Sequence, residues 1–215
     1  MSTWVNQNAI FLSLPIEQLL AITAYGEAAS EGAEEMMGVL NVVNNRASNV
    51  TMFGDTEIYN LTGSPYHAVV LKQKQFSMFN IGNTVRPTAE RMASNFETEV
   101  MSNGILGQAY DLAIMLLNSQ LSDNTGGATY YHATYVNPSW ASSMTMLGKI
   151  GNHVFYSSPR SIIASLLPSS YVRGSGESQS QVEMGIQAAG FGNIAWFLII
   201  GAGIGIIFQV LRKTL

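Results

Sequence analysis

The 215-residue sequence contains no cysteine, and this absence excludes several kinds of chemistry. Disulfide scaffolds, cysteine-ligated zinc and thiol nucleophiles all require that residue. A zinc site built on histidine would need a spacing such as H-E-x-x-H, which does not occur around the three histidines. We therefore expect no metal ion and no other cofactor.

Charge is also scarce, because only 11% of the residues are Asp, Glu, Lys or Arg, against roughly 25% in average soluble domains. Ser, Asn, Thr and Gln take their place, which predicts a polar, weakly charged surface suited to neutral partners such as glycans. All 14 acidic residues and eight of the ten basic ones precede residue 190, so this part has a net charge of −6. It contains no Lys/Arg cluster, and we expect no nucleic-acid binding.

Composition divides the chain into segments. The first twelve residues lack the basic and apolar regions of a secretory signal peptide. We expect a globular domain over residues 1–157, a flexible Ser/Gly-rich linker over 158–187, a transmembrane helix over 188–211 and a short basic tail over 212–215. The membrane span is predicted because residues 194–208 have no polar side chain, and a bilayer requires about 20 largely apolar residues. The alternative for this segment is a fully buried helix of a soluble protein.

The apolar segment is followed directly by Arg212 and Lys213. The positive-inside tendency places such residues on the cytoplasmic side of a membrane. We therefore expect a single-pass membrane protein with a C-terminal anchor and with lipid as its partner through residues 188–211. Gly201 and Gly205 would let two such helices pack as a homo-oligomer, although glycine is also simply common in membrane helices.

Secondary structure is predicted from periodicity and residue type. Hydrophobic periodicity predicts helices over residues 15–27, 33–47, 88–101 and 105–120, with loops and short helical pieces over 48–82. Aromatic and β-branched residues are concentrated at 128–136 and 149–156, which favours strands. These elements predict an α+β fold, mostly helical, with a small sheet late in the chain.

One acid lies on the apolar face of the first predicted helix. At about 100° per residue, Ile16, Leu19, Leu20, Thr23 and Glu27 form a single stripe. Burial raises the pKa of a carboxyl group, and cleavage of a glycosidic bond requires an acid that is protonated near neutral pH. Glu27 is therefore the candidate general acid; the ordinary alternative is an acid that is salt-bridged or reaches water at the helix edge.

A series of short motifs continues along the chain. They are the YGEA of residues 25–28 with Glu31, Asn45-Arg46, the QFS of 75–77, the TGGATYY of 125–131, Trp140 and the IGNHVFY of 150–156. In this order they resemble the SleB/CwlJ-type cell-wall hydrolases, named for spore-cortex-lytic enzymes and also found in bacteriophages. The resemblance covers residues 17–156. Ala29-Ser30 departs from it, because family members often carry Arg-Gly there.

The resemblance implies a lysozyme-like or lytic-transglycosylase-like fold that acts on the glycan strands of peptidoglycan. It also implies that Glu27 is the catalytic acid. The candidate substrate-binding residues are Glu31, Gln75, Phe76, Ser77, Tyr130, His132, Trp140 and His153. Gln75 and Ser77 have donors and acceptors for sugar groups, with Phe76 packed beneath them.

The aromatic and histidine candidates have alternative roles. Tyr130, Tyr131 and Trp140 would stack on sugar rings or belong to an ordinary aromatic core. His132 and His153 are unlike metal ligands in their spacing, and we expect His153 to be a hydrogen-bonded framework residue near the cleft.

Two mechanisms remain open. Hydrolysis needs two carboxyl groups around the sugar, about 5–5.5 Å apart for retention or 6.5–9.5 Å for inversion. Glu31, one turn after Glu27 on the same predicted helix face, would approach from the same side and act as a supporting residue, so Asp55 or Asp123 is the candidate second acid. A lytic transglycosylase needs only Glu27 and forms a 1,6-anhydro product, and this is the preferred route.

The alternative function is a glycan-binding or structural membrane protein of the same fold without activity. A wall-degrading domain with a C-terminal anchor and no signal peptide fits the virion membrane of a bacteriophage, where it would open the host wall for genome delivery. The membrane of a bacterial cell is the other expected location.

Overall fold

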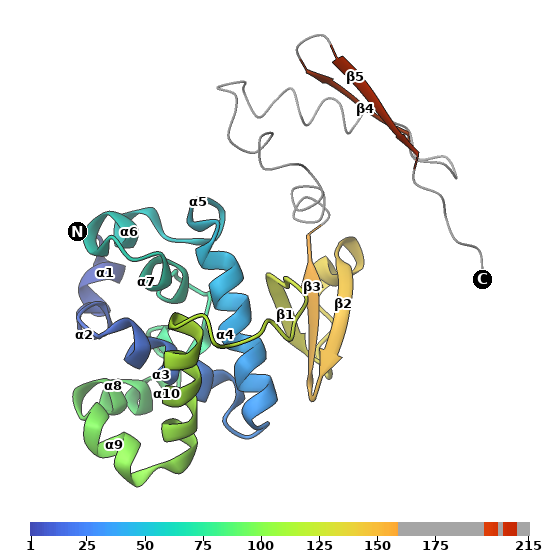
Figure 1. The fold of residues 1–215 in the computed structure, drawn as a ribbon. Helices are drawn as coiled ribbons and strands as arrows, with labels where there is room; N and C mark the ends of the chain where they lie inside the picture. Colours follow the sequence, from blue (N-terminus) through green and yellow to red (C-terminus); the bar gives the residue numbers. More distant parts are fainter. Residues whose placement is uncertain (159–195, 202–203, 210–215) are drawn as a thin grey trace. The chain divides into compact units, whose positions relative to one another are not determined.

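The computed structural model describes residues 1–158, 196–201 and 204–209, and the chain forms two compact units, Met1–Ser165 and Leu166–Leu215. The helices of the first unit are α1 (Thr3–Gln7), α2 (Ala9–Leu12), α3 (Ile16–Ala28), α4 (Ala33–Ala47), α5 (Val50–Phe53), α6 (Thr56–Thr62), α7 (Pro65–Val70), α8 (Arg86–Ser94), α9 (Phe96–Ser102) and α10 (Gly104–Leu117), with 3₁₀ turns η1 (Ser77–Phe79) and η2 (Ser139–Ser143) (Figure 1). Its strands are β1 (Tyr130–Ala133), β2 (Thr145–Ile150) and β3 (His153–Ser157). The predicted α+β class, mostly helical with a small late sheet, is confirmed.

The longest helices lie where periodicity predicts them. Helix α3 has Pro15 at its N-cap, a residue with the fixed φ that suits a helix start, and α4 matches the predicted range 33–47. Asn103 begins α10, because its side-chain oxygen accepts hydrogen bonds from the backbone N–H groups of Ile105 and Leu106 at 3.1 and 3.2 Å.

The helix predicted over residues 88–101 is wrong, because two helices occupy this range. Asn95 separates α8 from α9 with φ −133° and ψ 36°. Its side-chain nitrogen donates to the carbonyl of Arg91, and the Ser94 hydroxyl donates to the carbonyl of Glu90. Such local side-chain bonds compete with the helical hydrogen bonds, which periodicity does not register.

Helix α3 lies at the centre of the main core and packs against α4, α7, α8 and α10. Leu19, Leu20 and Ile22 on this helix are fully buried. Phe11 and Phe79 close another side of the core, with ring centroids 4.9 Å apart in an edge-to-face arrangement. The stripe that sequence periodicity predicts is therefore the inner face of the central helix.

The three strands form an antiparallel sheet in the order β1-β3-β2, beside α4 (Figure 1). A second, smaller core lies between α4 and the sheet and contains Val42, Ala128 and Phe155. Phe155 approaches Gly38 so closely that a Cβ atom there would lie 2.7 Å from the ring. Glycine at this position therefore lets the sheet pack on α4.

The range 149–156, where composition favours strands, contains the turn of a hairpin with a strand on each side. β2 ends at Ile150, and β3 begins at His153 after the two-residue turn Gly151-Asn152. Gly151 has φ 52°, which glycine adopts at little cost. The turn chemistry rather than the β-branched composition sets the strand boundary.

In the second unit, β4 (Trp196–Gly201) and β5 (Ile204–Gln209) pair as an antiparallel hairpin. The transmembrane helix predicted over residues 188–211 is not observed in these twelve described residues, and its remainder and the linker over 159–187 lie outside them. The β-branched isoleucines favour strands, and the closely spaced glycines disfavour a helix. Within the described residues no single helix has the length and apolar composition of a membrane span; only α9 and α10 together do, and they are bent by 115°.

Candidate active site

The last turn of α3 carries Glu27 at the edge of the main core. Leu19 and Thr23 on the same stripe are fully buried, whereas Glu27 is partly exposed. Gly26 beside it leaves space for Met78, because a Cβ atom at residue 26 would lie 2.0 Å from the Met78 sulfur. The segment that contains Met78 therefore closes onto this turn of the helix.

Tyr131 on β1 is the direct partner of the acid, and its hydroxyl donates to Glu27 Oε2 at 2.8 Å. Its ring stacks on Phe155 with centroids 5.9 Å apart and meets His153 edge-on at 5.2 Å. Burial and the adjacent Glu27 charge raise the pKa of Tyr131 well above its ordinary value, so the hydroxyl stays a donor. Tyr131 is thus packed among aromatic rings and also contacts Glu27, and its predicted stacking on sugar rings stays a prediction.

Burial raises the pKa of Glu27 above its ordinary value of 4.5, which is the direction expected for an acid on an apolar stripe. Several weaker interactions lower this pKa: the hydrogen bond from Tyr131, the charge of His153, a hydrogen bond from the Ser77 backbone and the charge of Arg46. Glu27 therefore keeps its proton to higher pH than an exposed glutamic acid, while partners for its ionised form surround it.

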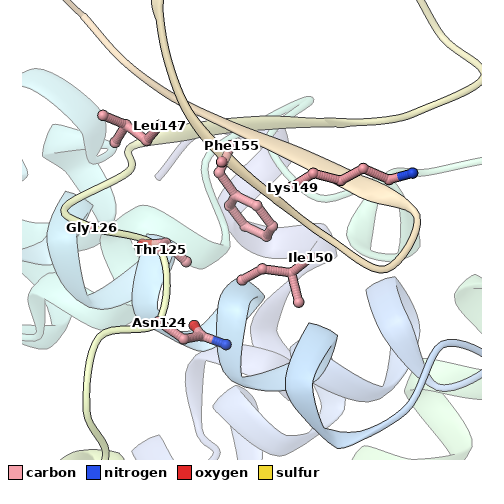
Figure 2. Close-up of a pocket in the computed structure, with 8 residues that line it drawn as sticks. Asn124, Thr125, Gly126, Leu147, Lys149, Ile150 and Phe155 are labelled. Atoms are coloured by element: carbon pink, nitrogen blue, oxygen red, sulfur yellow. The ribbon is translucent and has the colours of Figure 1, made fainter.

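Glu27 lines a pocket of about 390 Å³. The lining residues are Gly26, Glu27, Arg46, Gln75, Ser77, Tyr131, His132, Ala133, Tyr135, Val136 and His153. Among these described residues Glu27 is the only carboxylate. A second pocket, of about 270 Å³, includes Asn124, Lys149 and Phe155 in its lining and contains no acid (Figure 2). An acid catalyst needs a carboxyl group, so the pocket of Glu27 is the candidate active site.

Four of the predicted substrate-binding residues line the pocket of Glu27, namely Gln75, Ser77, His132 and His153. Ser77 is exposed and Gln75 half-buried, so both are accessible to a ligand. The Nε2 atom of His132 lies 3.0 Å from the Tyr156 hydroxyl, which fixes the orientation of the imidazole ring. The pocket thus presents hydrogen-bonding side chains and the Arg46 guanidinium around one acid.

The aromatic residues Phe76, Tyr130 and Trp140, which were predicted to bind substrate, lie outside this lining. Phe76 is 1% exposed and belongs to the core, which leaves it no surface for direct contact with a sugar. Tyr130 and Trp140 pack against each other with centroids 5.7 Å apart, and Trp140 also meets His132 at 5.6 Å. These rings form an aromatic cluster that supports His132.

Glu31 does not continue the helix that carries Glu27, so the predicted one-turn relationship between the two acids is wrong. Helix α3 ends at Ala28, and Gly32 adopts φ 99° in the turn that follows. Glu31 is exposed and accepts a hydrogen bond from the Asn152 side chain at 2.5 Å. It therefore links the end of α3 to the β2–β3 turn and does not line the pocket.

The two other acids considered for hydrolysis have structural partners. Asp55 caps α6, where it accepts from the backbone N–H of Ile58 at 3.1 Å. Asp123 accepts from the backbone N–H groups of Thr125 and Gly127, both at 2.8 Å. Its hydrogen bonds with this loop hold the pKa of Asp123 below its usual range despite partial burial. Neither acid lines the pocket of Glu27.

Glu35 on α4 is a buried acid that the sequence reasoning missed. Its carboxylate accepts from the backbone N–H of Asn152 at 2.8 Å and lies 2.6 Å from His153 Nδ1. A Cβ atom on Gly151 would lie 1.5 Å from Glu35 Oε1, so the turn passes directly over the carboxylate. Glu35 thereby fixes both the hairpin and the imidazole ring of His153, the framework role expected for that histidine.

Arg46 is the other buried charged residue of α4, and it lines the pocket. Both residues were recoverable from the sequence, because Glu35, Val39, Val42 and Arg46 share one stripe at helical spacing. The same argument that singled out Glu27 on α3 therefore applies to α4. Within residues 1–158, 196–201 and 204–209, no three His, Asp or Glu side chains gather as metal ligands would.

The family model for Cell Wall Hydrolase matches residues 30–156 of the chain, which is more than half of its 215 residues. The chain belongs to this family. The match confirms the family predicted from the order of the motifs. It begins after Glu27, so the assignment of this acid rests on its own surroundings.

Two solved structures are similar to the cell wall hydrolase chain. One is the catalytic domain of the germination-specific lytic transglycosylase SleB from Bacillus anthracis, with TM-score 0.46 and 20% identity over 66% of this chain and 93% of the other. The other is the catalytic domain of the Bacillus cereus SleB protein, with TM-score 0.43 and 19% identity over 66% and 89%. No curated protein matches the chain.

We predict that Gly151→Ala destabilises the protein. The substitution adds about 1–3 kcal/mol of backbone strain at positive φ, and its methyl group would also displace the Glu35 carboxylate. Urea unfolding measures the loss. Gly148→Ala on β2 is the control, because a Cβ atom there contacts nothing within 4 Å, and equal stability of the two variants would contradict the prediction.

We predict that Tyr131→Phe raises the pKa of Glu27 further. The Tyr131 hydroxyl stabilises the ionised carboxylate and so lowers the pKa of Glu27. Without this hydroxyl, less opposes the rise in pKa that burial causes. The ¹³C chemical shift of the Glu27 carboxyl group, followed against pH, measures the change. Tyr66→Phe is the control, because its hydroxyl donates to Asn44 at 2.8 Å and is not among the groups that act on Glu27. An unchanged or lowered pKa in Tyr131→Phe would contradict the prediction.

Proposed function

We propose that this cell wall hydrolase cleaves the glycan strands of peptidoglycan as a lytic transglycosylase, with Glu27 as its single acid and base. The observation that carries the proposal is the pocket, where Glu27 is the only carboxylate among the described lining residues. The raised pKa of Glu27 supports the first role, because the acid must hold a proton before cleavage.

The reaction needs two proton transfers at the same carboxyl group. Protonated Glu27 gives its proton to the glycosidic oxygen, the bond from that oxygen to the anomeric carbon breaks, and the leaving oxygen keeps the electron pair. The 6-hydroxyl oxygen of the muramic acid then bonds to the anomeric carbon, and its proton passes to the Glu27 carboxylate. The product is a 1,6-anhydro sugar, and the enzyme returns to its starting state.

The arrangement of the acids favours this route over hydrolysis. A glycoside hydrolase of the common kind needs a second carboxyl group about 5–9.5 Å from the first to act as nucleophile or to activate water. Asp55 and Asp123 are held by backbone N–H groups, and Glu35 is covered by the β2–β3 turn. Gln75, Ser77 and His132 supply hydrogen-bonding groups suited to sugar hydroxyl and N-acetyl groups.

The test is digestion of purified peptidoglycan by the full chain and by Glu27→Gln, with the products identified by mass spectrometry. We expect anhydro-muramyl products from the wild type and a loss of at least about 100-fold in Glu27→Gln. Asp55→Asn and Asp123→Asn are the controls, which we expect to form the same products when folded.

Other products would overturn the proposal in distinct ways. Reducing-end sugars that require Glu27 and one of the aspartates would indicate hydrolysis by two acids. Glycan binding without cleavage by any of the four proteins would indicate a binding protein of this fold. Anhydro products formed equally by Glu27→Gln would place the catalytic acid elsewhere.

Loss of activity in Glu27→Gln must be separated from loss of the fold. Because the folded-state pKa of Glu27 is raised, its contribution to stability is present below the unfolded pKa of 4.5 and is lost as pH rises through the folded value. Thermal unfolding of Glu27→Gln at neutral pH should therefore occur at or above the wild-type temperature.

We also propose that residues 188–211 attach the enzyme to a lipid membrane, in a bacteriophage virion or in a bacterial cell. The support is the sequence, in which residues 194–208 lack polar side chains and Arg212 and Lys213 follow closely. Wall degradation at a membrane would place the reaction beside the peptidoglycan layer.

Flotation with phosphatidylglycerol-containing vesicles tests this attachment. We expect the full chain to float with the vesicles and the double variant Ile199→Lys/Ile206→Lys to stay in the dense fraction, because each lysine costs about 2.5–3.5 kcal/mol at the centre of a bilayer. Ser175→Lys/Ser178→Lys adds the same charge in the preceding segment and should float. Equal behaviour of the two double variants would overturn the attachment.

A further inference from the structure

Arg46 is a buried cation whose hydrogen bonds are incomplete. Its Nε atom donates to the carbonyl oxygen of Thr129 at 2.7 Å, and the residue is 5% exposed. Its Nη1 atom is buried and has no hydrogen-bond partner in the described part of the chain. An orphaned guanidinium N–H group in a protein interior is costly, and it indicates a partner that the resting site does not supply.

The other deeply buried arginine shows what a purely structural guanidinium looks like in this fold. Arg86 on α8 donates from Nε to Glu90 at 2.8 Å, from Nη1 to the Asn8 side chain at 3.1 Å and from Nη2 to the Gln7 carbonyl at 2.6 Å. All three of its nitrogens are thus used. Arg46 is equally buried but faces a pocket, and within the described residues only its Nε makes a hydrogen bond.

Aromatic rings hold the Arg46 guanidinium in place without neutralising it. Its central carbon lies 5.8 Å from the centroid of Tyr130 and 5.9 Å from those of Phe53 and Phe76. Such rings attract a cation and restrict its movement, but the positive charge remains. The site therefore keeps a fixed positive charge beside the pocket.

The anion that matches this charge is the Glu27 carboxylate. Both residues line the pocket, their charges interact, and among the described lining residues no other carboxylate is present. We propose that Arg46 is a positioning residue that stabilises Glu27 in its ionised form, in the interval between the two proton transfers. This inference rests on the proposed function, because only in a single-acid reaction must Glu27 stay ionised until it accepts the proton of the 6-hydroxyl group.

The groups that face Glu27 from the neighbouring elements differ in when they carry charge. Tyr131 on β1 is a neutral donor, and the Ser77 backbone is also neutral. His153 on β3 is charged only when protonated, and Glu35 at 2.6 Å already balances that charge. Burial lowers the pKa of Arg46 on α4, yet its guanidinium stays charged throughout the working pH range. It is thus the one permanent cation among the described groups that act on Glu27.

The test is the pH dependence of kcat/KM for the full chain, together with the ¹³C titration of Glu27, which needs no activity. In Arg46→Gln and Arg46→Met we expect the Glu27 titration and the alkaline limb of kcat/KM to move to higher pH, because a charge that lowers the pKa of Glu27 is removed. We also expect kcat to fall about tenfold or more with little change in KM, because the carboxylate formed by proton donation is less stable. Arg46→Lys keeps the charge and should stay near the wild-type limb.

Arg86→Gln is the matched control, since it removes an equally buried guanidinium and should lower stability without moving the Glu27 titration. Titrations are run at a temperature where circular dichroism shows every variant to be folded. The inference is overturned if Glu27 titrates at the wild-type pH in both neutral variants, or if Arg46→Lys behaves as they do at a pH where ¹⁵N NMR shows its ammonium group to be protonated. Absence of anhydro products from the wild type is a separate result, and it would overturn the proposed function.

Discussion

A charged side chain that leaves water must find a partner, and α4 brings two such side chains against the sheet. Glu35 is satisfied by the backbone of Asn152 and the ring of His153, so it fixes the β2–β3 hairpin. Arg46 is held by the Thr129 carbonyl and by three aromatic rings. The position of the sheet, and with it the far wall of the pocket, depends on these two buried charges.

The acid itself comes from the other side of the pocket. Glu27 belongs to α3 and the main helical core, whereas Tyr131 and His153 belong to the sheet. The environment of the carboxyl group is therefore assembled from two layers. Burial raises its pKa, and Tyr131 and His153 on the sheet, together with Ser77 and Arg46, limit that rise. A single carboxyl group that must both donate and accept a proton needs burial, which favours its protonated form, and neighbouring donors and charges, which favour its ionised form.

Sequence periodicity identified α3, α4 and the acid, because a helix that packs on one face leaves a stripe of apolar residues in which Glu27 stands out. It failed where short-range hydrogen bonds decide the chain path, as at Asn95 and at the Gly151-Asn152 turn. The contact of Tyr131 with Glu27 joins residues 104 positions apart, so no local pattern could reveal it. The predicted roles of Gln75, Ser77, His132 and His153 remain predictions, now with a shared pocket.

The two hydrophobic clusters of the first unit have a further consequence. The large cluster joins the helices, while Val42, Ala128 and Phe155 form the small one beneath the sheet, and Tyr131 packs against both. Small cooperative units open locally at a lower free-energy cost than the whole fold. Local opening of the sheet would leave Glu27 on α3 and remove the Tyr131 donor on β1 and the His153 charge on β3. The pKa of Glu27 would therefore depend on how often the sheet opens locally. The same opening would widen the pocket for a polymeric substrate.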